Sequence, residues 1–519
     1  MDVDATAATA PARGAPAVAA PWSHLLTALS AIAALLLVAM VAQRVGYPFE
    51  LEWMEGAMVD EAVRVRHGQP TYGPPGVDHV PFLYTPLLYW VGALAMTLFG
   101  ESFLAMRAVA VGATLLCAWL VFHMVRRDTG SARAGLWAVG LLCAGYGWLR
   151  SWYDLGRNDM LFLATMLGTW CLLRRGTARA AAAAGAVAVL AFLAKQTALL
   201  WLPALVLAAL VRDRRRGAWF AAVAVGGIGV AVLLLELRTD GWFSFYAFTM
   251  PRSHTVQEDR VLGFFTQDLV PVLPLLGAAA TALVLRWRQD RAGTAATALA
   301  VLGALAASYA SRLHVGGFDN VLAYGFAALL VTAPWLAVAA PRPRQRAVGA
   351  ALLALQFALL AVDVRALWAQ RPTLLYDPAV WLPKPAHRHA SEQLLAFAQG
   401  RDGPVWLLFH GHMAAIAGKA PAAHGQALHD LLGHLLQPGL PADDRAATAL
   451  QASAREALAS KRFAAIVLEQ PYGASFEGVF GPMLSEYQRL PGPLIDDAVA
   501  IRPTVGMVID TPYALVPKR

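Results

Sequence analysis

The sequence predicts an all-α polytopic membrane protein followed by a small α/β domain. Hydrophobic residues make up 58% of the 519 residues, a larger share than soluble domains carry. Runs such as Trp22–Gln43 and Phe220–Leu237 are apolar on nearly every helical face, and they have the length of about 20 residues that a helix needs to cross a bilayer. After residue 362 the apolar runs shorten to the length of strands.

Eleven apolar segments are predicted to cross the membrane. The first is expected to remain as an anchor, because no convincing cleavage site follows it. Residues 1–21 are rich in Ala and Pro and lack an apolar core, so we expect a disordered cytoplasmic tail. The predicted spans are 22–43, 103–125, 134–151, 159–173, 180–195, 196–211, 218–237, 269–285, 294–311, 321–340 and 347–362. Residues 22–362 therefore form the predicted membrane domain.

The arginines fix the expected orientation of these spans. Five short loops hold sixteen arginines against three aspartates, and loops of this composition usually face the cytoplasm. The loops are 126–133, 174–179, 212–216, 286–291 and 341–346. The segments between them must then face outwards, including the first outer loop, 44–102. Since the net charge of +8 arises largely from the arginine loops, it gives no reason to expect a nucleic-acid partner.

Phe82–Gly100 is nearly long enough to cross the membrane, but a crossing here would place every arginine-rich loop outside. Reversing the first span instead would put residues 44–81 in the cytoplasm, although they contain six carboxylates and only three arginines. We therefore expect this segment to lie in the outer interface, where Tyr84, Tyr89 and Trp90 suit the depth of the lipid headgroups.

Residues 363–519 are predicted to form a small extracytoplasmic α/β domain. Strand-length runs at Val405–Phe409, Ala464–Leu468 and Gly506–Ile509 alternate with helix-like stretches such as Ala442–Ser460. All three cysteines lie within predicted spans, so we expect this domain to fold without disulfides. His410 and His412 alternate at the end of a predicted strand and are expected to be surface residues rather than metal ligands.

The polar residues of the outward segments are the candidate site. Glu52 and Glu55 are three residues apart, so on a helix they share one face. Asp159 begins a span, where it either caps the helix or faces a ligand. Lys195 lies between two apolar runs and needs an anionic partner or a route to the surface. The other candidate substrate-binding residues are Tyr84, Asp154, Arg157, Gln196, His254, Arg312, His314 and Asn320.

These side chains have complementary chemistry. A carboxylate can act as general base towards a hydroxyl, and Arg, Lys or His can stabilise a departing phosphate. An anion held at the outer membrane face, beside aromatic and apolar walls, would most naturally be a lipid phosphate.

Four motifs, in this order and spacing, resemble the GT-C glycosyltransferases, and in particular the branch with lipid A aminoarabinose transferases and protein O-mannosyltransferases. The resemblance covers roughly residues 22–340. An acidic motif, Glu-Trp-Met-Glu-Gly, follows the first span, and a Pro-Phe-x-Tyr-x-Pro-Leu-x-Tyr-Trp stretch at 81–90 leads to Phe-Gly and Arg107. Arg-Asn-Asp-Met-Leu-Phe (157–162) opens the fourth span, and Phe-Leu-Ala-Lys-Gln (192–196) is similar to the family's Leu-Thr-Lys turn.

The resemblance implies a GT-C-like membrane fold and a catalytic carboxylate in the first outer loop, with Glu55 as its first choice. The family often has Asp-Glu where this chain has Met54-Glu55, which leaves Glu52 as a rival. It also implies that Asp159 lies in the same cavity and that Lys195 approaches the donor phosphate. No ligand pattern demands a divalent metal, although some relatives use one.

The implied function is inverting transfer of a monosaccharide from a polyprenyl-phosphate donor to an acceptor hydroxyl, at the outer face of a bacterial cytoplasmic membrane. The acceptor class, whether glycan, lipid or protein, stays open. One alternative is another enzyme, an O-antigen ligase-like protein that uses a pyrophosphate-linked glycan, although such ligases usually concentrate their chemistry in one large late loop. Two alternatives of other classes remain. A transporter or flippase would need polar residues at mid-membrane with access from both sides, and a non-catalytic envelope-assembly protein would not need its carboxylates.

Overall fold

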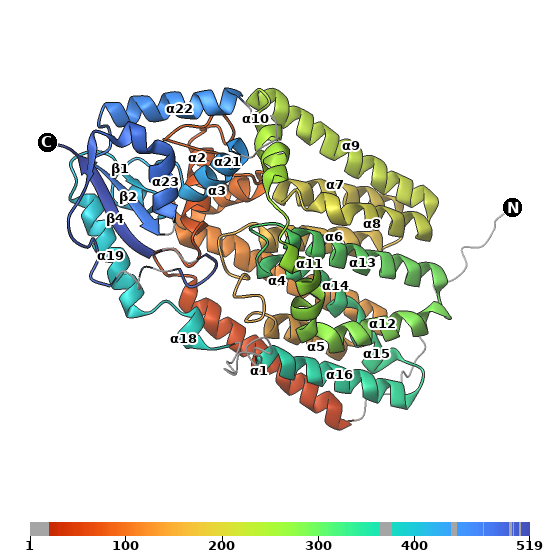
Figure 1. The fold of residues 1–519 in the computed structure, drawn as a ribbon. Helices are drawn as coiled ribbons and strands as arrows, with labels where there is room; N and C mark the ends of the chain where they lie inside the picture. The colour runs from red at the N-terminus through yellow and green to blue at the C-terminus, as the bar shows by residue number, and fades with distance from the viewer. Residues whose placement is uncertain are drawn as a thin grey trace.

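The computed structural model describes residues 20–362, 376–436, 444–470, 472–497, 501, 503–507 and 510–519. Helices make up most of these residues, and a small sheet lies at one end of the helical body (Figure 1). Residues 1–19 of the predicted tail (1–21) lie outside the described residues. Helix α1 begins at Ala20. The architecture is therefore the predicted one: a polytopic helical body with a C-terminal α/β part.

Each predicted span has a helix in the structure. The helices are α1 (Ala20–Arg44), α4 (Phe103–Thr129), α5 (Ala132–Ala144), α6 (Asp159–Leu173), α7 (Ala178–Ala194), α8 (Ala198–Arg212), α9 (Arg214–Thr239), α12 (Leu273–Trp287), α13 (Arg291–Leu313), α14 (Ala323–Thr332) with α15 (Pro334–Ala339), and α16 (Pro343–Ala361). Within the described ranges, six helices are long and apolar enough to cross a membrane. The chain is a multi-pass membrane protein, and the count of eleven spans stays a prediction.

Local sequence signals explain many of these helix ends. Ser102, Ser131, Thr177, Asp213 and Asp290 each precede a helix, and each side chain accepts a hydrogen bond from a backbone N–H of the first turn. Such caps satisfy donors that the helix itself leaves unpaired.

Two predicted spans differ from the observed helices. The span 134–151 was drawn too long, since α5 ends at Ala144 and is followed by turns in which Arg150 and Ser151 have positive φ values. The span 321–340 is divided at Pro334, whose ring and missing N–H interrupt an α-helix.

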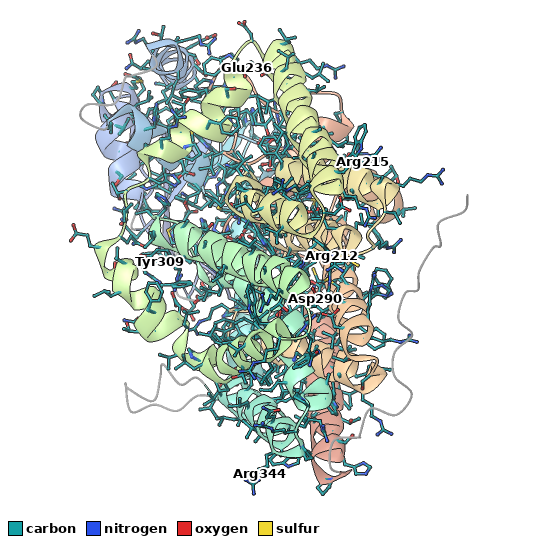
Figure 2. The ribbon with its side chains drawn as sticks, turned by 90° about the vertical axis from the view of Figure 1, so that its right-hand side faces the viewer. Arg212, Arg215, Glu236, Asp290, Tyr309 and Arg344 are labelled. Atoms are coloured by element: carbon teal, nitrogen blue, oxygen red, sulfur yellow. The ribbon has the colours of Figure 1, made fainter. Side chains whose placement is uncertain are left out.

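The arginine loops lie at the end of the helical body opposite the sheet. Figure 2 looks onto this end, and its labels place Arg212, Arg215 and Arg344 there. Asp128 bridges two of the loops through ion pairs with Arg174 and Arg286. The candidate site residues belong to the other end, so the arginine loops and the candidate site lie at opposite ends of the helical body.

The first outer loop forms two short helices, α2 (Glu55–Arg66) and α3 (Leu87–Phe99), which pack against each other. At 13 residues, α3 is shorter than the roughly 20 residues that a crossing requires. Its outer face exposes Leu94 and Leu98, while Leu88 and Tyr89 are buried. This one-sided apolar exposure agrees with a helix lying in the interface.

Between α9 and α12 the chain forms short helical pieces: α10 (Trp242–Ser244), η1 (Phe245–Thr249), η2 (Met250–Ser253), α11 (Glu258–Gly263), η3 (Phe264–Asp268) and η4 (Val270–Val272). A further turn, η5 (Asp319–Leu322), precedes α14. These pieces carry the loop residues His254 and Asn320.

The C-terminal part has a four-stranded sheet in the order β1-β2-β4-β3. Strand β1 (Val405–Leu407) is parallel to β2 (Ala465–Gln470), and β4 (Asp510–Pro517) is antiparallel to both β2 and β3 (Tyr487–Arg489). Its helices are α18 (Pro378–Trp381), α19 (Pro385–Gln399), α20 (Met413–Ile416), α21 (Gly425–Leu435), α22 (Asp444–Ala459), α23 (Tyr472–Phe480) and the turn η6 (Gly481–Leu484).

Two of the three predicted strands are confirmed as β1 and β2, and α22 confirms the predicted helix. The strand predicted at 506–509 is wrong in position, because Gly506 has a φ of 86° and the strand begins at Asp510; residues 508 and 509 lie outside the described residues. The short strand β3 has no apolar run and was not predicted.

Candidate active site

Glu52 lies just before α2 and is fully buried. Its Oε2 accepts hydrogen bonds from the backbone N–H of Met54, at 3.1 Å, and from Nη1 of Arg157, at 3.3 Å. Its other oxygen, Oε1, is buried without a hydrogen-bond partner. Burial raises the pKa of Glu52 to about 8, although the guanidinium of Arg157 opposes the shift. A carboxyl group with one free oxygen and a raised pKa can accept a proton from a ligand.

Arg157 links this carboxylate to the aromatic wall of the first outer loop. Its Nη2 donates to the hydroxyl of Tyr84 at 2.9 Å, and its guanidinium lies over the rings of Tyr84 and Trp152, at 5.3 and 5.7 Å from their centroids. Its Nε has no hydrogen-bond partner. The cation is thus oriented on two sides and keeps one donor for a ligand.

Asp159, at the start of α6, forms the second half of the cluster. Its Oδ1 accepts from Nζ of Lys195 at 2.6 Å and from Nδ2 of Asn320 at 2.7 Å, while its Oδ2 is buried without a partner. Lys195 also donates to the hydroxyl of Tyr324 at 3.1 Å. The N-cap residue is Asn158, and the carboxylate of Asp159 turns sideways to the lysine instead of capping the helix.

Gln196 completes the cluster beside Lys195. Its side-chain amide donates to the backbone carbonyls of Leu83, at 2.7 Å, and Ala247, at 3.3 Å. Its Oε1 is buried and unpaired, as is Oδ1 of Asn320. Five buried polar atoms of the cluster therefore lack partners: Oε1 of Glu52, Nε of Arg157, Oδ2 of Asp159, Oε1 of Gln196 and Oδ1 of Asn320.

The charged members of this cluster are close enough to interact: the carboxylate of Asp159 interacts electrostatically with both Glu52 and Arg157. Buried polar atoms are nearly always hydrogen-bonded, so a group of unpaired ones calls for an explanation. A bound ligand with hydroxyl donors and an anionic group would satisfy them together.

Glu55 has a different environment. Its two oxygens accept from Nε and Nη2 of Arg107, at 2.8 and 2.7 Å, and from the backbone N–H groups of Gly156 and Leu51, at 2.8 and 3.0 Å. Burial alone would raise the pKa of Glu55, but Arg107 and these N–H donors hold it below its usual value. Both oxygens are occupied, so this carboxylate joins three segments of the chain.

Asp154 is also occupied. Its carboxylate accepts two bonds from Arg44, at 2.8 and 3.3 Å, and the hydroxyl of Tyr146 lies 3.3 Å from each oxygen. All three side chains are fully buried. The pair connects the end of α1 to the turn that carries Arg157.

The remaining predicted residues lie in neighbouring loops. Arg312 pairs with Asp268, at 2.8 and 3.1 Å, and donates to the carbonyl of Gly317. His254 lies 3.5 Å from Asp430 of α21, and its hydrogen bond to this carboxylate raises its pKa. His314 is exposed, with Nδ1 3.2 Å from the carbonyl oxygen of His254. The loop with Asn320 bonds to Asp159 itself, and the loop with His254 reaches the cluster through the carbonyl of Ala247, which accepts from Gln196.

His410 and His412 contradict the prediction of surface residues. They are 3% and 5% exposed and lie beside Glu50 and Asp60 of the first outer loop. The alternating pattern could not reveal this, because their partners are about 350 residues away in the sequence. Tyr324 and Asp430 were also missed, since a tyrosine in an apolar span and an aspartate in a polar helix carry no local signal.

The positive charge of the cluster comes from side chains. In the part of the chain that the structure describes, no three His, Cys, Asp or Glu side chains are grouped so that they could hold a metal ion. The cluster instead offers two cations, Lys195 and Arg157, beside its carboxylates. The charge of an anionic ligand can be met by these side chains.

Comparison with known proteins agrees with this architecture. The sequence model of the dolichyl-phosphate-mannose-protein mannosyltransferase family matches residues 79–237. This stretch includes Tyr84, Arg157, Asp159, Lys195 and Gln196. A search of curated protein sequences gives no match.

Solved structures share the fold over nearly the whole chain. ArnT from Cupriavidus metallidurans in the apo state has a TM-score of 0.59 at 15% identity, and the same protein bound to undecaprenyl phosphate has 0.56 at 16%. In both comparisons 96% of this chain and 98% of that chain are covered. The apo oligosaccharyltransferase of Archaeoglobus fulgidus has a TM-score of 0.51 at 14% identity, covering 91% of this chain and 73% of that one. Residues 79–237 therefore resemble this mannosyltransferase family, and the chain shares the fold of ArnT and of the oligosaccharyltransferase.

Proposed function

We propose that this protein transfers a monosaccharide from a polyprenyl-phosphate donor to an acceptor hydroxyl at the outer face of a bacterial cytoplasmic membrane. The observation that carries the proposal is the group of unpaired buried atoms around Glu52 and Asp159, with Arg157 and Lys195 beside them. Two features support the lipid-linked donor: the membrane-spanning fold, and the undecaprenyl phosphate named in the similar ArnT structure.

Glu52 is the proposed general base. The acceptor hydroxyl donates to Oε1 of Glu52. The oxygen of that hydroxyl attacks the anomeric carbon of the donor sugar, and the bond between this carbon and the phosphate oxygen breaks. The proton stays on Glu52, and the lipid leaves as polyprenyl phosphate. This single displacement inverts the anomeric configuration, because no covalent sugar–enzyme intermediate forms.

The geometry favours Glu52 over Glu55 for this role. Every oxygen of Glu55 is already bonded to Arg107 or to backbone N–H groups, so a proton could be accepted only after one of these contacts breaks. Glu52 has an oxygen without a partner and a pKa that burial raises to about 8. Glu55 then serves to hold the loop on which Glu52 lies.

Asp159 and the two cations have complementary roles. Lys195 and Arg157 stabilise the negative charge that develops on the departing phosphate. Asp159 orients Lys195 through its Oδ1, while its unpaired Oδ2 accepts from a sugar or acceptor hydroxyl. Tyr84 and Asn320 hold Arg157 and Asp159 in place.

The test is a comparison of lipid extracts by mass spectrometry. Cells lacking the protein and cells with Glu52→Gln should both accumulate a polyprenyl-phosphate monosaccharide, whose mass identifies the class of sugar. Glu61→Gln is the matched control, because Glu61 is also buried but bonds to His79 instead of to Arg157. Unchanged lipid pools, together with full rescue of the deletion by Glu52→Gln, would overturn the proposal and favour a transporter or assembly protein.

A further inference from the structure

The C-terminal α/β part forms hydrogen bonds with the loop that carries Glu52. The backbone N–H of Val505 and the hydroxyl of Thr504 both donate to the carbonyl of Leu51, at 3.0 Å. Glu52 itself forms a parallel bridge with Val505. The far end of the chain therefore fixes the backbone on which the proposed base is carried.

Glycines make this contact unusually close. A Cβ on Gly56 would lie 1.9 Å from the carbonyl oxygen of Gly411, and a Cβ on Gly411 would lie 2.4 Å from the backbone nitrogen of Ala57. Helix α2 and the turn after β1 thus meet backbone to backbone, an approach that only glycine allows. Figure 1 draws α2, α3 and α21 at the same end of the molecule as the sheet.

A buried histidine lies at the centre of this contact. Nδ1 of His410 forms a hydrogen bond of 2.9 Å with Oε2 of Glu50. Its Nε2 lies 3.5 Å from Oε1 of Glu469 without forming a hydrogen bond. The side chains are 4%, 9% and 0% exposed, respectively. Glu469 belongs to β2, His410 follows β1, and Glu50 is two residues before Glu52. The histidine therefore lies between β2 of the sheet and the segment of the first outer loop that carries Glu50 and Glu52.

A second histidine adds a parallel link. The backbone N–H of His412 donates to Oδ2 of Asp60 at 2.7 Å, and its Nδ1 is 3.1 Å from Oδ1. Its Nε2 is 3.3 Å from the carbonyl oxygen of Glu101. Because Asp60 is on α2, the two histidines hold both the loop and the helix that follows it.

The charge state of the centre depends on several neighbours. Burial raises the pKa of Glu50 well above its usual range and that of Glu469 to about 7, and it lowers the pKa of His410. The groups facing His410 are Glu50, Glu469 and His424, and those acting on Glu50 are Glu55, Asp60, His412 and Arg107. Two buried carboxylates beside one imidazole share their protons as a coupled unit.

We propose that His410 is a positioning residue, which holds Glu52 in place by its hydrogen bond to Glu50 and its burial against Glu469 of β2. This role rests on the proposed function of Glu52 as the base. The C-terminal part then completes the active site from outside the membrane body. A displacement of about 1 Å in a catalytic group can cost about 10²-fold in rate, so a loosened loop should lower kcat.

The experiment compares His410→Ala, His410→Asn and the matched control His389→Asn in the full-length protein in detergent. His389 is exposed and lies on α19, where its Nε2 is 3.8 Å from Oδ2 of Asp496. Hydrogen–deuterium exchange without substrate is followed by mass spectrometry over residues 49–60. We expect faster exchange there in His410→Ala, and partial rescue in His410→Asn, because the asparagine amide can occupy the position of Nδ1.

Transfer kinetics supply the second readout. In His410→Ala we expect kcat to fall about 10²-fold, the donor KM to change little, and the pH profile of kcat to shift. Glu469→Gln, which keeps the shape of the site, provides a folded variant if His410→Ala does not fold. Its pH profile should shift in the same way.

The two proposals fail in different ways. If the wild type transfers no sugar, the proposed function fails, while the exchange measurement still reports on the contact. If Glu52→Gln abolishes transfer, but His410→Ala leaves both the exchange of residues 49–60 and the pH profile unchanged, the positioning role alone is overturned.

Discussion

Arg107 and Glu55 form a fully buried pair in which two guanidinium nitrogens each donate to one carboxylate oxygen, at 2.8 and 2.7 Å. The same arginine donates to the backbone carbonyls of Arg44, Tyr47 and Phe49. One side chain of α4 thereby fixes the start of the first outer loop. The pair gives Glu55 an environment that Glu52, in the same acidic motif, does not share.

The first prediction separates the two glutamates by stability. Glu55→Gln leaves the charge of Arg107 buried and uncompensated, which should cost about 3–5 kcal/mol of unfolding free energy. Glu52→Gln should cost much less, since Glu52 makes a single longer contact with Arg157. Thermal unfolding of both variants in the same detergent measures the difference. Equal melting temperatures would contradict the assignment of Glu55 as the structural member.

The second prediction concerns rate. Glu52→Gln should lower kcat by about 10²–10⁴-fold, the usual contribution of a general base. The measurement is transfer by purified protein at saturating donor, normalised to the folded fraction. Glu61→Gln should stay close to wild type.

The third prediction concerns pH. The pKa of Glu52 is raised to about 8, so below this pH most of the free enzyme carries a protonated, inactive base. The value of kcat/KM should therefore rise with pH and level off near 8. A profile that is flat between pH 6 and 9 would show that another group takes the proton.

The fourth prediction concerns the phosphate-binding cation. Lys195→Met should lower kcat/KM by about 10²–10³-fold, whereas Lys195→Arg keeps the positive charge and should lose much less. Binding of polyprenyl phosphate, measured by its effect on melting temperature, should weaken in Lys195→Met. Unaltered lipid binding together with lost activity would assign Lys195 to positioning Asp159 only.

The fifth prediction tests the histidine centre through stability. The pKa of Glu469 is about 7 in the folded protein and about 4.5 when unfolded, so the folded state holds the extra proton between these values. Stability from this group is therefore present at low pH and lost as pH rises towards 7, by at most about 3 kcal/mol. Comparing the wild type with Glu469→Gln from pH 5 to 8 isolates this change, because glutamine stays neutral throughout.

Much of the fold follows from local sequence. A run of about 20 apolar residues can satisfy its backbone in a bilayer only as a helix, so the spans are visible without tertiary information. The same holds for the caps at Ser102 and Thr177, whose hydroxyls act within three residues. The breaks at Gly145 and Pro334 are weaker signals, because apolar residues continue on both sides.

The sequence by itself determined the helical membrane body, its charge asymmetry and the end of the molecule on which the polar motifs gather, since each depends on short-range composition. Only the tertiary structure decided which partners each polar side chain has. Glu52 and Glu55 look alike in the motif, but their partners differ. Arg107, 52 residues beyond Glu55, bonds to Glu55, whereas Oε1 of Glu52 has no partner. His410 meets Glu50 across 360 residues. Partners this distant are set by chain packing, and the free energy of a buried charge depends on those partners more than on its neighbours in sequence.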